Sequence, residues 1–127
     1  MSDGKGPARP ISPHLTIYRP QINMVMSIMH RIAGVAMAFG AMLIVWWFLS
    51  VARGGDAFET VDGLLTSWFG GLIMIGFLWA MWYHFCNGIR HLVWDVGHGF
   101  ELDKLEKSGV IVAAASVALT IFTLIVM

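Results

Sequence analysis

Three long uncharged stretches dominate the pattern of hydrophobic and polar positions along the chain. They cover residues 32–52, 63–83 and 108–127. Each is about as long as the ~20 residues with which a helix crosses ~30 Å of hydrocarbon. The composition agrees, because 57% of the residues are hydrophobic and only 13% are charged, a balance typical of membrane proteins. The sequence therefore predicts an all-α membrane protein with three transmembrane helices.

The rest of the chain is too short for a soluble domain, so we treat residues 1–127 as one membrane-anchor domain. The expected helices cover about 23–52, 64–92 and 108–127. Asn23 is a suitable N-cap for the first helix. Residues 1–22 contain all four prolines, and proline biases the residue before it away from the helical region. We therefore expect a cytoplasmic segment there, either extended or lying along the membrane interface.

The basic residues are divided unevenly between the two ends of these helices. Only Arg53 falls in the loop after the first helix, where it stands beside acidic residues. The other seven lie at the opposite end: Lys5, Arg9, Arg19, Arg31, Arg90, Lys104 and Lys107. Because basic residues concentrate on the cytoplasmic side, we expect a cytoplasmic N-terminus and a periplasmic C-terminus. The start of the chain shows no signal or transit peptide pattern. This favours a protein of the bacterial inner membrane over one of the mitochondrial inner membrane, and the alternative is a mature chain whose presequence has been removed.

A stripe of unusual residues lies near the end of the second predicted helix. His84, Gly88, His91 and Asp95 stand at i, i+4, i+7 and i+11 and so share one helix face. In hydrocarbon an imidazole is costly and is normally retained for a function. A histidine beside a glycine notch suits a flat cofactor, so we interpret His84 as an axial ligand of haem iron. The alternative is an interhelical hydrogen-bonding histidine.

No other histidine of the chain lies at a similar depth, so a second subunit would supply the other axial ligand of such a haem. Basic groups flank the stripe at the cytoplasmic rim, and they can bind the anionic propionates of haem. We place His30, Arg31 and His91 on the propionate side. Snorkelling and the positive-inside rule explain Arg90 adequately, and Asp95 is a candidate ion-pair partner of Arg31 or Arg90.

Ser27 and Arg31, one helical turn apart, form a small polar notch at the membrane surface. A quinone needs hydrogen-bond donors of this kind for its ring oxygens. The alternative for Ser27 is a bond to the backbone carbonyl four residues earlier, which is common for serine in membrane helices. The spacing alone leaves both interpretations open.

Three segments of the chain resemble one known family in order and spacing. They are Arg9-Pro-Ile-Ser-Pro-His-Leu-Thr-Ile-Tyr-Arg-Pro20, Ser27-Ile-Met-His30-Arg31-Ile-Ala-Gly34, and His84-x3-Gly88-Ile-Arg90-His91-Leu-x2-Asp95. The chain resembles, over its whole length, the cytochrome b subunit of succinate dehydrogenase, the larger haem-bearing membrane anchor of respiratory complex II. Ala33 departs from the Thr or Ser usual before Gly34, and no role depends on it.

The resemblance implies roles for individual residues. The histidine matching His84 ligates a haem b that is shared with a small membrane anchor subunit. The residues matching Ser27 and Arg31 line the ubiquinone site, which a tyrosine of the small anchor and the iron–sulfur subunit complete. The residues matching His30 and Arg31 approach the haem propionates. Succinate oxidation would take place on a flavin in a separate flavoprotein subunit.

We therefore expect a non-flavin subunit of succinate:ubiquinone oxidoreductase, embedded in membrane lipid and without catalysis by the isolated chain or a nucleic-acid partner. One alternative is the anchor of a quinol:fumarate reductase, because the direction of electron flow depends on redox potentials that a sequence does not reveal. Another is a non-catalytic helical anchor whose histidines are structural. The single Cys86 excludes an internal disulfide and an iron–sulfur cluster within this chain.

Overall fold

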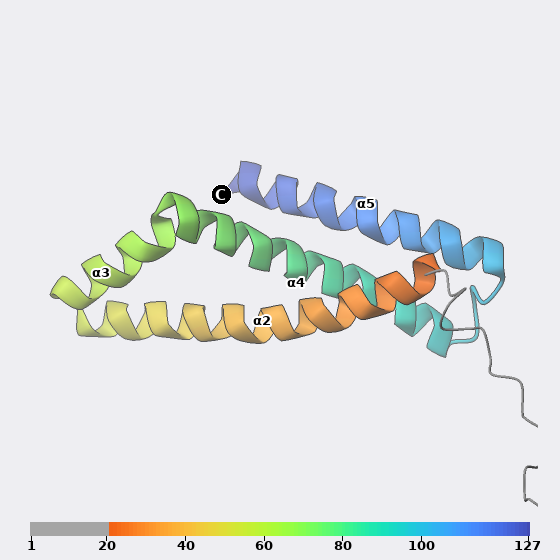
Figure 1. The fold of residues 1–127 in the computed structure, drawn as a ribbon, viewed down its shortest axis with the longest axis horizontal. Coiled ribbons are helices and arrows are strands. Elements are labelled where there is room, and N and C mark those ends of the chain that lie inside the picture. Colours follow the sequence, from red (N-terminus) through yellow and green to blue (C-terminus); the bar gives the residue numbers. More distant parts are fainter. Residues whose placement is uncertain (1–20) are drawn as a thin grey trace, which may run out of the picture.

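The structure is a computed structural model that describes residues 21–127 as a bundle of helices (Figure 1). The predicted segment 1–22 therefore lies outside the described residues, apart from its last two positions. The helices are α2 (Ile22–Arg53), α3 (Gly55–Thr66), α4 (Trp68–Asp95) and α5 (Leu102–Val126).

Three of these helices are long and apolar enough to cross a membrane, namely α2, α4 and α5. They contain 32, 28 and 25 residues, and at ~1.5 Å per residue the shortest is still roughly 38 Å long. That exceeds the ~30 Å of a hydrocarbon core. The prediction of an all-helical membrane protein with three spans is therefore confirmed.

Helix α3 was not expected from the sequence. It occupies the predicted loop and the first positions of the helix expected over 64–92, so α4 starts only at Trp68. The break before α3 is made by Gly54 and Gly55, whose φ values of 66° and 55° suit residues without a Cβ. Ser67 then caps α4 by accepting a hydrogen bond from the Gly70 amide at 3.1 Å.

The three long helices pack most closely at the end where α2 and α5 begin and α4 ends (Figure 1). The buried core there consists of Met26, Ala33, Ala80, Tyr83 and Val112. Tyr83 of α4 donates a hydrogen bond to the Met26 carbonyl of α2 at 3.0 Å. Gly109 of α5 allows a close approach to α2, since a Cβ there would lie 2.6 Å from the Met26 sulfur. This end of the bundle is also the end that contains the predicted site.

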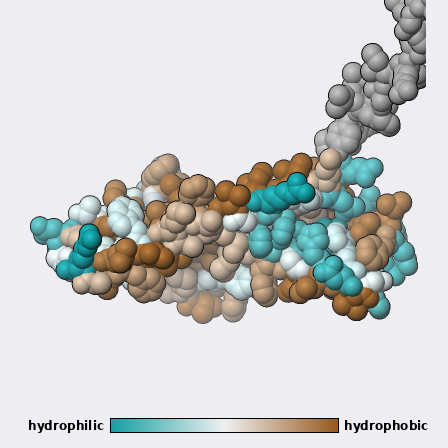
Figure 2. All heavy atoms as spheres, turned by 90° about the horizontal axis from the view of Figure 1, so that it is seen from below, coloured by the Kyte–Doolittle hydropathy of each residue, from teal (hydrophilic) through white to brown (hydrophobic). Residues whose placement is uncertain are grey.

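The outer surface is largely apolar along the length of the bundle. Figure 2 shows hydrophobic residues over the middle and hydrophilic ones gathered toward the two ends. Large side chains such as Phe39, Phe48 and Phe122 are 59%, 61% and 62% exposed. An apolar surface of this extent marks contact with lipid or with other membrane helices.

Candidate functional site

Three histidines from two helices meet near the core. His30 of α2 stacks on His84 of α4, with ring centroids 4.0 Å apart and planes inclined by 14°. His91 lies two turns further along α4, with its ring 5.3 Å from that of His30 at an angle of 56°. All three side chains are half-buried. The structure thus brings together three of the residues that the sequence singled out. It also places the ring of His30 at the depth of His84, so the expectation that no other histidine of the chain lies there is wrong.

Gly34 determines how closely α2 approaches this cluster. A Cβ at Gly34 would lie 3.2 Å from Nε2 and 3.4 Å from Cδ2 of His84. His30 lies one turn before Gly34 and covers the face of the same imidazole. His30 of α2 therefore covers one face of the His84 ring, and any residue larger than glycine at position 34 would crowd its Nε2 edge.

The cluster keeps hydrogen-bonding capacity that the described chain does not use. Nδ1 of His30 is buried and has no hydrogen-bond partner within residues 21–127. Gly88, one turn after His84, is half-buried, and a Cβ built on it would meet no heavy atom within 4 Å. Buried polar atoms normally have a partner, and glycine inside a helix costs roughly 0.5–1 kcal/mol relative to alanine. The open space at Gly88 is typical of a surface that another group covers, whereas Nδ1 of His30 is an unsatisfied atom inside the cluster.

The arrangement does not suit a bare metal ion. Within residues 21–127, no group of three or more His, Cys, Asp or Glu side chains is placed to hold one. His30 and His84 turn their faces toward each other, whereas two imidazoles that share an ion point their nitrogens at it. Haem iron needs only one imidazole from each side, because the macrocycle supplies its other ligands. One imidazole of this chain, such as that of His84, would therefore be enough to hold a haem.

Ser27 and Arg31 lie on the same helix as His30. Ser27 is half-buried, and within the described chain its hydroxyl makes no hydrogen bond, so the backbone bond considered above is absent. Arg31 is exposed and stands at an apolar groove of about 510 Å³ between α2 and α4. The other residues that line this groove are Ile32, Val35, Ala36, Phe39 and Phe77.

Two expectations for the charged residues are wrong. Asp95 is exposed and pairs with neither Arg31 nor Arg90, since the ion pairs within residues 21–127 are Lys104–Glu101 and Lys107–Asp103. Arg90 does not snorkel to the surface. It is only 6% exposed, and its guanidinium donates hydrogen bonds to Asn23 of α2 and to Leu105 and Ser108 of α5.

Asn23 is also used differently from the prediction. Gln21 occupies the N-cap position of α2, and Asn23 lies in the first turn, where its Oδ1 accepts a hydrogen bond from Arg90 at 2.7 Å. Sequence reasoning missed this link. The available signal was the amide side chains of Asn23 and Asn87 close to the predicted membrane boundary, which need buried partners much as Arg90 does.

Residues 5–123 match the family model described as succinate dehydrogenase/fumarate reductase transmembrane subunit. The chain belongs to this family. The succinate dehydrogenase cytochrome b556 subunit of Paracoccus denitrificans is 42% identical over 126 residues, covering 99% of this chain and 97% of that protein. That of Rickettsia prowazekii (strain Madrid E) is 38% identical over 112 residues, covering 88% and 87%. The mitochondrial cytochrome b560 subunit of Sus scrofa is 40% identical over 117 residues, covering 88% and 68%.

These comparisons confirm the resemblance inferred from the three sequence segments. They confirm the prediction of a cytochrome b membrane anchor subunit of succinate dehydrogenase. The three apolar helices make it a multi-pass membrane protein.

Proposed function

We propose that this chain binds one haem b with His84 as an axial ligand of the iron, and that a second, smaller membrane anchor subunit supplies the other axial ligand. Haem contributes one-electron redox chemistry when it is bound. The relatives are named as b-type cytochrome subunits, which supports a haem in this chain. The observation that carries the proposal is the setting of His84, stacked by His30 and lying one turn from the open notch at Gly88.

The residues around His84 would orient the ligand and balance charge. The stacked ring of His30 restricts rotation of the His84 imidazole, and Gly34 keeps its Nε2 edge clear of a side chain. We assign His30, Arg31 and His91 to the propionate side. The buried, unpaired Nδ1 of His30 can donate a hydrogen bond to an anion, and the exposed guanidinium of Arg31 makes no ion pair within residues 21–127.

Ser27 and Arg31 would form this chain's part of a ubiquinone site. The Ser27 hydroxyl is free to donate to a ring oxygen, because within the described chain it makes no bond to the backbone. The Arg31 guanidinium can stabilise negative charge that develops on a ring oxygen during reduction. The apolar groove beside Arg31 offers a path for an isoprenoid tail into the lipid. Ubiquinone is the substrate in this proposal, and quinol is the product.

The placement of the soluble partners follows from charge. Arg31, Arg90, Lys104 and Lys107 belong to the end at which α2 and α5 begin and α4 ends, while Arg53 at the other end lies near acidic residues of α3. By the positive-inside rule the first end is cytoplasmic and Met127 is periplasmic. The iron–sulfur subunit, with the flavoprotein subunit behind it, would therefore dock next to Ser27. A bacterial inner membrane is the proposed location.

The haem assignment is tested by absorbance and spin state in the assembled complex. The dithionite-reduced complex should show a b-type α-band. His84→Leu should abolish the low-spin bis-imidazole haem or leave an altered one, whereas His91→Leu should keep axial ligation intact. A complex without the α-band contradicts the haem proposal, and a high-spin haem produced by His91→Leu alone shows that the wrong histidine was assigned.

A further inference from the structure

Arg90 is the one buried residue among the lysines and arginines of residues 21–127. Its Nε donates to Ser108 Oγ at 2.8 Å, and its Nη2 donates both to Asn23 Oδ1 and to the Leu105 carbonyl at 2.7 Å. Its Nη1 lies 3.4 Å from Asn87 Oδ1 on its own helix. One guanidinium therefore joins α2, α4 and α5.

All of these acceptors are neutral. The described chain offers Arg90 no carboxylate, since its ion pairs involve other residues, and the face of Trp94 lies 4.3 Å from the guanidinium carbon. A cation whose task is only to mark the cytoplasmic side can reach water on its long stem, as the exposed Lys104 and Lys107 do. Burial of Arg90 instead places its planar guanidinium between the helices, where several N–H donors point in fixed directions. A lysine has no such group.

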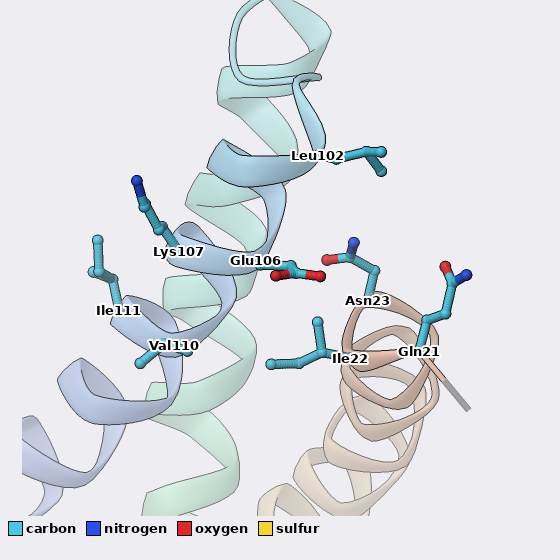
Figure 3. A pocket seen from close by; sticks show the side chains of 8 residues that line it. All are labelled: Gln21, Ile22, Asn23, Leu102, Glu106, Lys107, Val110 and Ile111. Carbon is cyan, nitrogen blue, oxygen red and sulfur yellow. The ribbon is translucent and has the colours of Figure 1, made fainter. Parts of the chain in front are cut away.

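The guanidinium of Arg90 bridges α2 and α5 where a groove separates the first turns of these two helices. A groove of about 890 Å³ lies between the first turns of the two helices. In Figure 3, Asn23 on α2 and Glu106 on α5 face each other across this gap. Arg90 reaches both sides from α4, through Asn23 on one side and Leu105 on the other. It thereby links the two helices at the place where the groove separates their first turns.

The link to Asn23 also constrains the histidine cluster. Asn23 lies two turns before His30 on α2, and Arg90 lies six residues after His84 on α4. The Asn23–Arg90 bond, the Tyr83–Met26 bond and the His30–His84 stack are therefore contacts along the same pair of helices. A change of register or tilt of α2 at the Asn23–Arg90 bond must displace His30 at the stack.

We propose that Arg90 is a positioning residue whose guanidinium clamps the first turns of α2 and α5 onto α4 and thereby holds His30 on the ring of His84. The effect on a bound haem rests on the function proposed above, while the clamp itself does not. The informative variant is Arg90→Lys, which keeps the positive charge and removes the guanidinium. Asn23→Ala removes only the hydrogen bond to Asn23 and leaves the 3.6 Å contact of Nη1 with the Met26 sulfur of α2. Arg53→Lys, at the exposed last residue of α2, is the matched control.

Two measurements on the assembled complex in membranes read the two parts of the proposal. The first is the rate at which a maleimide modifies Cys86, the single cysteine of this chain, detected by mass spectrometry of the chain. Cys86 is half-buried and lines a groove between α4 and α5 together with Arg90 and Ser108. The second is the electron paramagnetic resonance spectrum of the oxidised haem, whose g-values respond to the orientation of the axial imidazoles.

In the Arg90→Lys variant, the maleimide should modify Cys86 at least about fivefold faster than in the wild type. One lost hydrogen bond of ~1 kcal/mol shifts the equilibrium for local opening around Cys86 by that factor. Arg90→Lys should also shift the g-values with haem still bound. Asn23→Ala should shift the g-values and leave the labelling rate unchanged, and Arg53→Lys should match the wild type in both measurements.

Wild-type behaviour of Arg90→Lys in both measurements would overturn the proposal. A positive charge at position 90 would then be enough to hold the helices and the His84 ring, without a guanidinium. Faster labelling with unchanged g-values would overturn the positioning of His84 and leave only a structural brace. If the wild-type complex contains no haem, the proposed function fails, and faster labelling of Arg90→Lys still decides whether the clamp exists.

Discussion

The notch at Gly88 offers a direct test of whether a flat group lies against α4. Within the described chain, a Cβ at this position meets no heavy atom within 4 Å, and the residue is one turn from His84. A leucine side chain at this position therefore starts into space that the described chain leaves open. The helix should even gain about 0.5–1 kcal/mol, because glycine is among the poorest helix formers.

A haem seated over the notch would meet the new side chain. Inserting carbons into a well-packed contact costs about 1–3 kcal/mol, which corresponds to roughly 5- to 150-fold weaker retention of the haem. Gly88→Leu should therefore lower the haem content per purified complex, measured as the pyridine haemochrome against protein. The matched control is Gly76→Leu, because Gly76 lies on the same helix, also has nothing within 4 Å of its Cβ position, and is ~18 Å away along the axis.

The two variants must differ for the reasoning to hold. Normal haem content in the assembled Gly88→Leu complex would show that no haem covers the notch. Equal loss of haem in both variants would point to failed assembly, with leucine disturbing contacts of α4 that have nothing to do with His84.

Two further predictions concern the quinone site and the topology. Ser27→Ala and Arg31→Leu should lower succinate-driven ubiquinone reduction, by up to ~100-fold for a lost donor worth 1–3 kcal/mol, while reduction of a soluble dye by the flavoprotein subunit is spared. Unchanged quinone turnover in both variants would eliminate the site. A phosphatase fused after Met127 should be active and one fused at Lys104 silent, and the reverse pattern would refute the charge argument for orientation.

The number of membrane helices could be predicted because the bilayer itself fixes the length of an apolar stretch. Helix α3 could not, since it is short and carries Asp56, Glu59 and Asp62, and so resembles a polar loop in composition. Its position depends on tertiary contacts, such as the hydrogen bond from Trp47 of α2 to Asp62 at 3.1 Å. The glycine pair before it indicated a break in the chain, but a break leads equally well to a loop or to a new helix.

Helical periodicity predicts how His84 and His91 lie relative to each other, but it does not predict the contact of His30 with His84. His84 and His91 share a face because seven residues make two turns of one helix, and the structure has both beside α2. The stacking of His30 on His84 depends instead on how far α2 is shifted along α4, and no pattern within a single helix contains that quantity. Gly34 was a usable indication, because small residues mark the places where membrane helices approach closely.

Arg90 shows why charge at a membrane boundary is ambiguous when it is read along the sequence. An arginine there can extend to water or turn inward, and the positive-inside rule is satisfied in either case. The neutral polar residues decide between the two. Asn23 and Ser108 lie on other helices at the depth of Arg90, and each would be costly in hydrocarbon without a partner. Their acceptance of its donors satisfies all three groups at once, so burial of the cation and the placement of these polar residues have the same physical cause.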